Sequence, residues 1–205
     1  MPRGEPGFDK VYRMREFLNL ILRNSQRLYK LDREVAIDET MVPHKGRLSF
    51  KQYIKNKPTR WGIKLWVLCE AKTGYVYNFD VYLGNFSKEE GNVEHNLARR
   101  VVKQLVSLIE NKFHHLYMVN FYCDLYLFLE LERKQILACG TIRANRKGLP
   151  KDIVLTKAME RRMDRGDYVW RSHGNLVAMA WYDRRTVYLI STIHPPESNG
   201  ELSVV

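Results

Sequence analysis

The first recognisable pattern along the chain is an amphipathic helix near the N-terminus. Apolar residues there recur at the i, i+3, i+4, i+7 and i+8 spacing that places them on one helical face. They are Met14, Phe17, Leu18, Ile21 and Leu22. Such a stripe predicts that the helix packs on the rest of the molecule, and we assign residues 1–33 to an N-terminal helical segment.

Three β-rich runs come next, at residues 34–42, 61–69 and 75–83. The loop between the last two is short and ends in Gly74, which predicts a hairpin. Helical and strand-like patterns then alternate: a helix at 93–110 with Asn92 as its N-cap, a strand at 115–121, a helix at 124–133 and a strand at 135–141. This βββαβαβ order over residues 34–141 predicts a mixed α/β sheet with helices on its faces.

The chain changes character after residue 141. A basic, turn-rich stretch at 143–150 leads into three short strand-like runs, at 167–171, 176–181 and 186–191. We interpret residues 142–195 as a small antiparallel β subdomain. Residues 196–205 are expected to form a flexible tail.

The distribution of charge adds a functional hypothesis. The formal net charge is +11, which indicates a polyanionic partner, most often nucleic acid. Residues 40–69 carry +7 without a single Asp or Glu, and residues 141–165 carry +5. The DNA-contact candidates from these two segments are Lys45, Arg47, Lys51, Lys55, Lys57, Arg60, Lys64, Arg143, Arg146 and Lys147. A solvated basic loop is the alternative for each segment.

The first basic segment also contains the aromatic residues Phe50, Tyr53 and Trp61. Aromatic rings among cations are typical of surfaces that contact phosphates and pack against bases or sugars. No apolar run approaches the roughly 18–20 residues of a membrane helix, and we expect neither a membrane partner nor a secretory signal. The three cysteines form no CxxC pair, which favours a reducing compartment and gives no zinc-ribbon spacing.

Asp38 is the sharpest single candidate for chemistry, because it interrupts an apolar run predicted to be a central strand. A carboxylate there is costly unless it is paired, solvated at the rim of the sheet, or bound to a metal. Magnesium sites use one or two carboxylates together with substrate phosphates, so Asp38 by itself supplies half a site. A strand-rim or capping aspartate is the alternative interpretation.

Seven short motifs follow one another along the chain. They are Ile37-Asp38-Glu39, Lys55-Asn56-Lys57-Pro58, Trp61-Gly62-Ile63-Lys64, Gly74-Tyr75, Tyr82-Leu83-Gly84, the run 140–146 and the run 187–192. In this order and spacing the chain resembles the piggyBac transposase family over roughly residues 10–195. The resemblance implies an RNase H-like core with an inserted β subdomain, a nuclear location, and descent from a cut-and-paste DNA transposase.

The resemblance also implies which residues served catalysis. In the family, three carboxylates hold two Mg²⁺ ions for phosphodiester attack. The first corresponds to Asp38. The second begins an Asp-Asn-aromatic-aromatic motif, but here that stretch reads Val119-Asn120-Phe121-Tyr122. The third belongs to a Gly-Gly-Val-Asp type motif beyond the subdomain, and neither this motif nor the family's Cys-rich zinc domain occurs before Val205.

We therefore expect a core truncated at the C-terminus and a domesticated or decayed transposase derivative that associates with DNA without cutting it. Asp38 alone should hold Mg²⁺ too weakly to position two ions, so no cofactor is expected. Asp124 lies five residues after Val119, and its expected role is at a helix N-terminus. The alternatives are an active or partner-completed metal-dependent transposase or nuclease, a protein-interaction module that self-associates through an incompletely covered core, and a chain without selected function.

Overall fold

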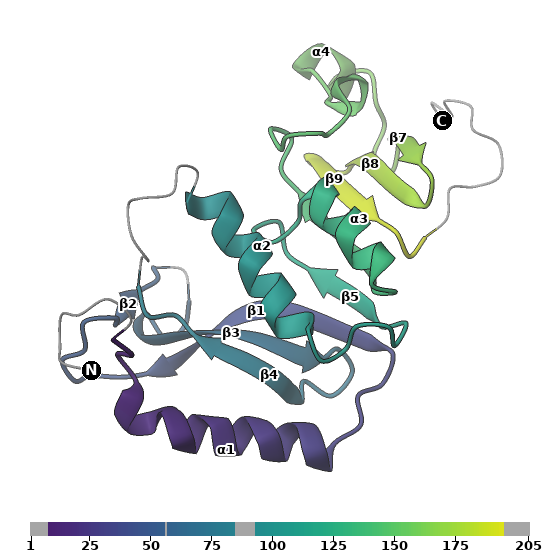
Figure 1. Cartoon of the computed structure of the whole chain (residues 1–205). Coiled ribbons are helices and arrows are strands. Elements are labelled where there is room, and N and C mark those ends of the chain that lie inside the picture. The colour runs from purple at the N-terminus through teal and green to yellow at the C-terminus, as the bar shows by residue number, and fades with distance from the viewer. Residues whose placement is uncertain (1–7, 56, 85–92, 195–205) are drawn as a thin grey trace.

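A computed structural model describes residues 8–55, 57–84 and 93–194 (Figure 1). The predicted N-terminal helix is present as α1 (Tyr12–Leu28). The three predicted β-rich runs are β1 (Glu34–Pro43), β3 (Trp61–Glu70) and β4 (Val76–Val81). A short strand that we did not predict, β2 (Gln52–Tyr53), pairs with the start of β3.

The alternating part of the chain also follows the predicted order. It consists of α2 (Val93–Val106), β5 (His115–Met118), α3 (Leu125–Arg133) and β6 (Leu137–Ile142). The helix predicted to reach residue 110 ends at Val106, and the chain turns there to reach β5. Asn92, the predicted N-cap of α2, lies outside the described residues.

The strands form the mixed sheet that the sequence predicts. The strand order is β2-β3-β1-β5-β6-β9-β8-β7, with β4 also paired to β3. The first strands are antiparallel, whereas β1, β5 and β6 are parallel neighbours. This arrangement, with helices α2 and α3 packed on the sheet, is RNase H-like (Figure 1).

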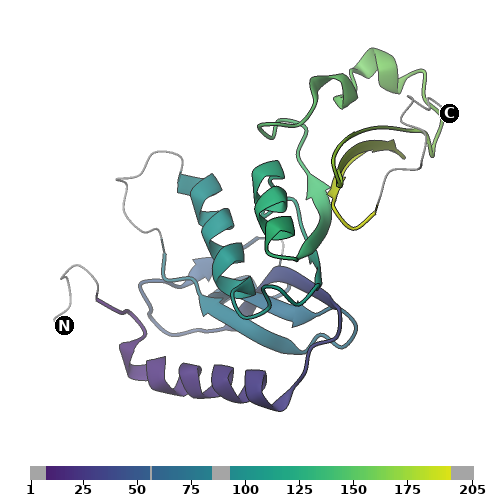
Figure 2. The same cartoon turned by 45° about the vertical axis from the view of Figure 1, so that its right-hand side comes forward.

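The three C-terminal strands are β7 (Tyr168–His173), β8 (Leu176–Tyr182) and β9 (Thr186–Ser191), joined as antiparallel neighbours. They follow the short η1 (Lys151–Ile153) and α4 (Lys157–Glu160). Strand β9 pairs with β6, from Cys139–Ser191 to Ile142–Tyr188. The β subdomain therefore continues the core sheet across the boundary expected at residue 142, and Figure 2 shows the sheet curving away from α2 at that end.

The main core lies between the sheet and helices α2 and α3. Val35 and Ile37 point into it from β1 and are almost completely buried, and Leu105 and Phe128 meet them from the two helices. Because side chains alternate along a strand, Ala36 and Asp38 point to the opposite face. A partly exposed row on that face contains Ala36 and its cross-strand neighbours Cys69, Tyr117 and Cys139.

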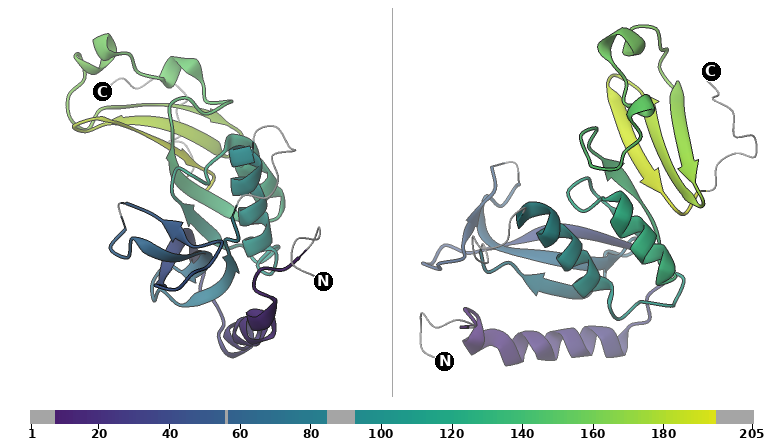
Figure 3. Two further views of the ribbon diagram at one scale, coloured as in Figure 1. Left: turned by 90° about the vertical axis from the view of Figure 1, so that its left-hand side faces the viewer. Right: turned by 45° about the horizontal axis from the view of Figure 1, so that its top comes forward.

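Helix α1 lies along β4 at the edge of the sheet (Figures 1 and 3). The Tyr29 ring stacks on Tyr75 at a centroid distance of 4.0 Å, and Leu18 joins a small apolar cluster. The predicted packing of the whole apolar stripe is wrong, because Met14, Phe17 and Ile21 are 51%, 55% and 38% exposed. The edge strand offers α1 only a narrow contact, which leaves most of the stripe in solvent. No helix in the described ranges is long and apolar enough to cross a membrane.

Candidate functional site

Asp38 lies where the pairing of two parallel strands ends. The last registered pair between β1 and β5 is Ile37 with Met118. One residue further along, Asp38 and Val119 stand at matching positions at the carboxyl ends of these strands. The Asp38 side chain is exposed, and its Oδ1 accepts a hydrogen bond of 2.8 Å from the Glu39 N–H. Its charge is therefore solvated at the rim of the sheet.

Val119 is the neighbour that Asp38 meets at this rim, and it is 44% exposed. The turn that follows is closed by a 3.0 Å hydrogen bond from the Tyr122 N–H to the Val119 carbonyl. An isopropyl side chain supplies no metal ligand. Of the two aligned positions, 38 and 119, only the first therefore carries a carboxylate.

Glu39 cannot complete a metal site with Asp38, because consecutive strand residues point to opposite faces. Glu39 lies beside Trp66 on the helix-covered face, as the register of β1 and β3 requires. The Tyr122 hydroxyl donates to its Oε2 at 3.5 Å, and the Lys57 ammonium lies 3.6 Å from its Oε1. Burial, with the nearby Glu39 and Asp38 carboxylates, raises the pKa of Tyr122.

Asp124 is engaged in local structure, as the sequence predicts. It is the N-cap of α3 and accepts a 3.0 Å hydrogen bond from the Leu127 N–H. The same carboxylate oxygen lies 2.5 Å from a guanidinium nitrogen of Arg99 on α2. These contacts join two helices, so Asp124 would have to abandon both to reach the rim at Asp38.

The residues present do not fit a two-magnesium site. The described ranges contain no group of three or more His, Cys, Asp or Glu residues that could hold a metal ion. Magnesium needs oxygen ligands in near-octahedral geometry, and of the two side chains at the aligned positions Asp38 offers a carboxylate and Val119 offers no oxygen. No chemical step through a metal can be derived from this set.

Lys64 was predicted as a DNA contact, but the structure packs it into the protein. Its ammonium lies 5.8, 5.7 and 5.6 Å from the ring centroids of Trp66, Tyr82 and Phe121. Desolvation lowers the pKa of Lys64, and the neighbouring Glu39 carboxylate opposes this shift. A half-buried cation among three rings contributes mainly to packing.

Two more predicted contacts have structural roles around the turn after β5. Lys57 donates to the Glu39 carbonyl at 3.2 Å. Arg146 donates to the carbonyls of Asn120 and Phe121 at 3.0 and 2.9 Å. The fold thus brings one residue from each basic segment, Lys57 and Arg146, to the carboxyl ends of β1 and β5. The local sequence does not predict that these two residues come to the same strand ends. Their placement depends on the loop after β6, which places Arg146 against the turn after β5.

The remaining predicted contacts lie at the surface. Lys51 is partly exposed and donates to the Gly46 carbonyl at 3.0 Å. The other six are exposed: Lys45, Arg47, Lys55, Arg60, Arg143 and Lys147. Six of the predicted contacts are therefore open to solvent, and Lys51 is partly so.

The three aromatic residues of the first basic segment divide into two groups. Phe50 is 5% exposed and packs with Val11 and Val81, so it cannot meet a base. Tyr53 and Trp61 are 49% and 56% exposed, and their ring centroids lie 4.8 Å apart. They are directly opposite each other on β2 and β3, a pairing that requires the strand we did not predict.

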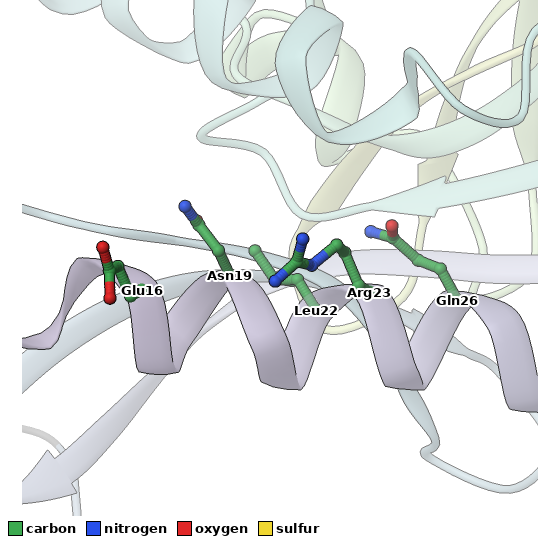
Figure 4. A pocket seen from close by; sticks show the side chains of 5 residues that line it. All are labelled: Glu16, Asn19, Leu22, Arg23 and Gln26. Carbon is green, nitrogen blue, oxygen red and sulfur yellow. The ribbon is translucent and has the colours of Figure 1, made fainter.

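Two surface hollows lie away from this rim. One, of about 570 Å³, runs along one side of α1 and is lined by Glu16, Asn19, Leu22, Arg23 and Gln26 (Figure 4). All five side chains come from a single helix, so no second element brings a reactive group to meet them. The other, of about 230 Å³, lies between α3 and strands β7 and β8 and has mostly apolar walls.

Comparison with known proteins identifies the family. The family model described as Transposase IS4 matches residues 2–202. This chain belongs to the piggyBac-type DDE transposases. It is 30% identical over 199 residues to the human PiggyBac transposable element-derived protein 3, covering 91% of this chain and 32% of that protein. It is 24% identical over 193 residues to the human PiggyBac transposable element-derived protein 2, covering 89% and 31%.

The same fold occurs in a solved piggyBac transposase, in a synaptic complex with hairpin DNA. The TM-score is 0.79 at 24% sequence identity, and the match covers 96% of this chain and 41% of that one. The mixed RNase H-like sheet expected of a piggyBac-type chain is therefore confirmed. The chain spans about a third of the length of the curated piggyBac-derived relatives it matches.

Proposed function

We propose that this piggyBac-type chain associates with DNA and does not cut it. The observation that carries the proposal is Val119, which stands beside Asp38 at the carboxyl ends of β1 and β5. Transposases of this class need paired carboxylates to position two ions. One exposed aspartate and one valine give too few ligands for that geometry, so we propose that the chain uses no metal cofactor.

The proposed DNA association rests on the exposed cations. Six of the predicted contacts are exposed, and Lys51 is partly so. Five of these seven belong to the acid-free segment 40–69, which carries a net charge of +7. Such residues would bind the phosphate backbone without reading base sequence, and each contact releases counterions. A DNA partner in turn favours the nuclear location expected of this family.

A nicking assay tests the proposed lack of cleavage. The full chain is incubated with supercoiled plasmid DNA and Mg²⁺ or Mn²⁺, and open-circular product is measured against a metal-free control. We expect no metal-dependent product from the wild type. Nicking that requires metal and disappears in Asp38→Ala would overturn the proposal and favour an active or partner-completed enzyme.

A salt titration tests the proposed DNA contact. Binding to a labelled duplex should weaken steeply between about 50 and 200 mM salt, because several phosphate contacts are made. Reversing Lys55 and Arg60 to Glu should reduce both the affinity and its dependence on salt. An affinity that the double variant leaves unchanged would remove segment 40–69 from the interface.

The partly exposed row of Ala36, Cys69, Tyr117 and Cys139 favours a second candidate function, self-association through the sheet face. An apolar interface of this kind responds weakly to salt, in contrast to a phosphate contact. Sedimentation velocity at low and high salt separates the two. A dimer that persists at 0.5 M salt while DNA binding is lost supports self-association, and a monomer at all concentrations excludes it.

A further inference from the structure

The hairpin formed by β2 and β3 presents two aromatic rings on the molecular surface. Tyr53 and Trp61 are paired across the two strands, with a centroid distance of 4.8 Å and a tilt of 46°. They keep 49% and 56% of their surface exposed. Large aromatic side chains are normally buried, and an exposed pair indicates a surface that meets a partner.

The surroundings of this aromatic pair define the chemistry of the partner. The Lys51 ammonium lies 5.3 Å from the centroid of the Trp61 ring. The loop of the hairpin is closed by a 2.9 Å hydrogen bond from the Ile54 N–H to the Arg60 carbonyl, and it carries Lys55 and Arg60 exposed to solvent. Residues 40–69 contain no acid. An anionic partner is therefore strongly favoured over a neutral or basic one.

We infer that Tyr53 and Trp61 form a stacking platform for an unpaired DNA base, with Lys51, Lys55 and Arg60 holding the adjoining phosphates. Aromatic rings flanked by cations are the combination by which proteins hold single strands, because every base offers a flat π-face beside a charged backbone. In an intact duplex each base face is covered by its neighbours, so the platform can act only on a single strand, a frayed end or an extruded base.

This inference rests on the proposed DNA association and makes it more specific. Exposed cations alone predict binding that depends on phosphates and ignores bases. The platform adds a contribution that needs a base but tolerates any base sequence. The chain should therefore prefer a single strand with bases to an otherwise identical strand that lacks them.

The experiment compares two labelled 12-nucleotide single strands by fluorescence anisotropy, one intact and one with abasic sites at its central positions. The wild type should bind the intact strand about fivefold or more tightly. Trp61→Ala should lose this preference and keep its affinity for the abasic strand. Trp61→Phe, which preserves a ring, should retain most of the preference.

Trp181 supplies a matched control, because it too is a partly exposed strand residue (37%) and lies opposite a tyrosine, Tyr168. It lies on β8, outside the acid-free segment. Trp181→Ala should leave both affinities unchanged. Should Trp61→Ala fail to fold, Trp61→Val keeps a strand-forming residue without a ring and serves the same comparison.

The possible results of these binding measurements either support or overturn the stacking platform. Equal wild-type affinity for the two strands, or a Trp61→Ala variant that weakens both equally or neither, overturns the platform while the proposed DNA association stands. A wild type that binds neither strand and no duplex overturns both proposals. Loss of preference in Trp61→Ala that Trp61→Phe and Trp181→Ala do not share supports the platform.

Discussion

Asp38 and Val119 occupy matching positions on two parallel strands, one residue beyond the Ile37–Met118 pair. This relationship makes Val119 the position on which our proposal depends. Side chains that meet at the same end of parallel neighbours can share a bound ion, whereas residues elsewhere in the fold cannot take their place without moving the backbone. The site can therefore be tested by restoring a carboxylate at one position.

Val119→Asp is expected to create a metal-responsive site beside Asp38. In the absence of metal, the two like charges should lower the thermal midpoint slightly. Millimolar Mn²⁺ should raise it again, because an ion that binds only the folded state stabilises it by mass action. A rise of about 2–4 °C for each kcal/mol of binding is expected at this chain length.

The control for Val119→Asp is Val119→Asn in an Asp38→Ala background, which leaves neither of the two positions with a carboxylate. It should show no response to Mn²⁺ in differential scanning fluorimetry. If Val119→Asp also shows no response to the metal, the two positions do not converge as the strand register indicates.

Asp124 is expected to stabilise the fold and to take no part in metal binding. Asp124→Ala removes the N-cap of α3 and its contact with Arg99, and should lower the free energy of unfolding by about 1–2 kcal/mol. Asp124→Asn keeps a capping oxygen and should recover most of that loss. Urea denaturation measures both variants, and an unchanged Asp124→Ala would contradict the assigned cap.

Variants of Lys64 and Arg60 are expected to differ in their effect on DNA affinity, because Lys64 is packed among aromatic rings and Arg60 is exposed. Lys64→Met keeps the apolar stem among the three rings and removes a desolvated charge, so DNA affinity should remain nearly unchanged. Arg60→Glu changes an exposed residue and should weaken duplex binding, reducing the salt slope by about 1. Anisotropy titrations at several salt concentrations measure both, and the reverse pattern would place Lys64 at the interface.

Tyr122 is expected to make the fold sensitive to alkaline pH. Burial raises its pKa in the folded state, so its contribution to stability is fully present below about pH 10 and is lost as the pH rises above that value. Burial also raises the pKa of Cys123, to about 12, which extends the effect downward to about pH 9. Tyr122→Phe should therefore flatten the decline in thermal midpoint above about pH 10, whereas Tyr126→Phe, at an exposed site, should not.

Much of the local architecture could be predicted from patterns along the chain. The β-rich runs became β1, β3 and β4, and the alternation after residue 93 became α2, β5, α3 and β6. These predictions succeed because the spacing of apolar residues reports the backbone conformation that gathers them on one face. The match of Asp38 to a family pattern and the departure of Val119 from it were likewise visible in the sequence.

The fate of individual side chains could not be predicted in the same way. Phe50 and Trp61 lie in one basic segment, yet the first is buried and the second is exposed. Lys64 and Arg60 have the same charge, yet only Lys64 lies among aromatic rings. In each case the difference arises from residues distant in the sequence, such as Val11 beside Phe50 and Phe121 beside Lys64.

The sequence by itself determined the order of most helices and strands, the excess of positive charge and the presence of valine at position 119, because each is a property of residue type and spacing. Only the tertiary structure decided that β9 continues the sheet from β6 and that Tyr53 meets Trp61 on the surface. Those outcomes depend on strand register and on contacts between distant segments. Local patterns specify the elements, and the free energy of packing those elements together decides which side chains remain available for function.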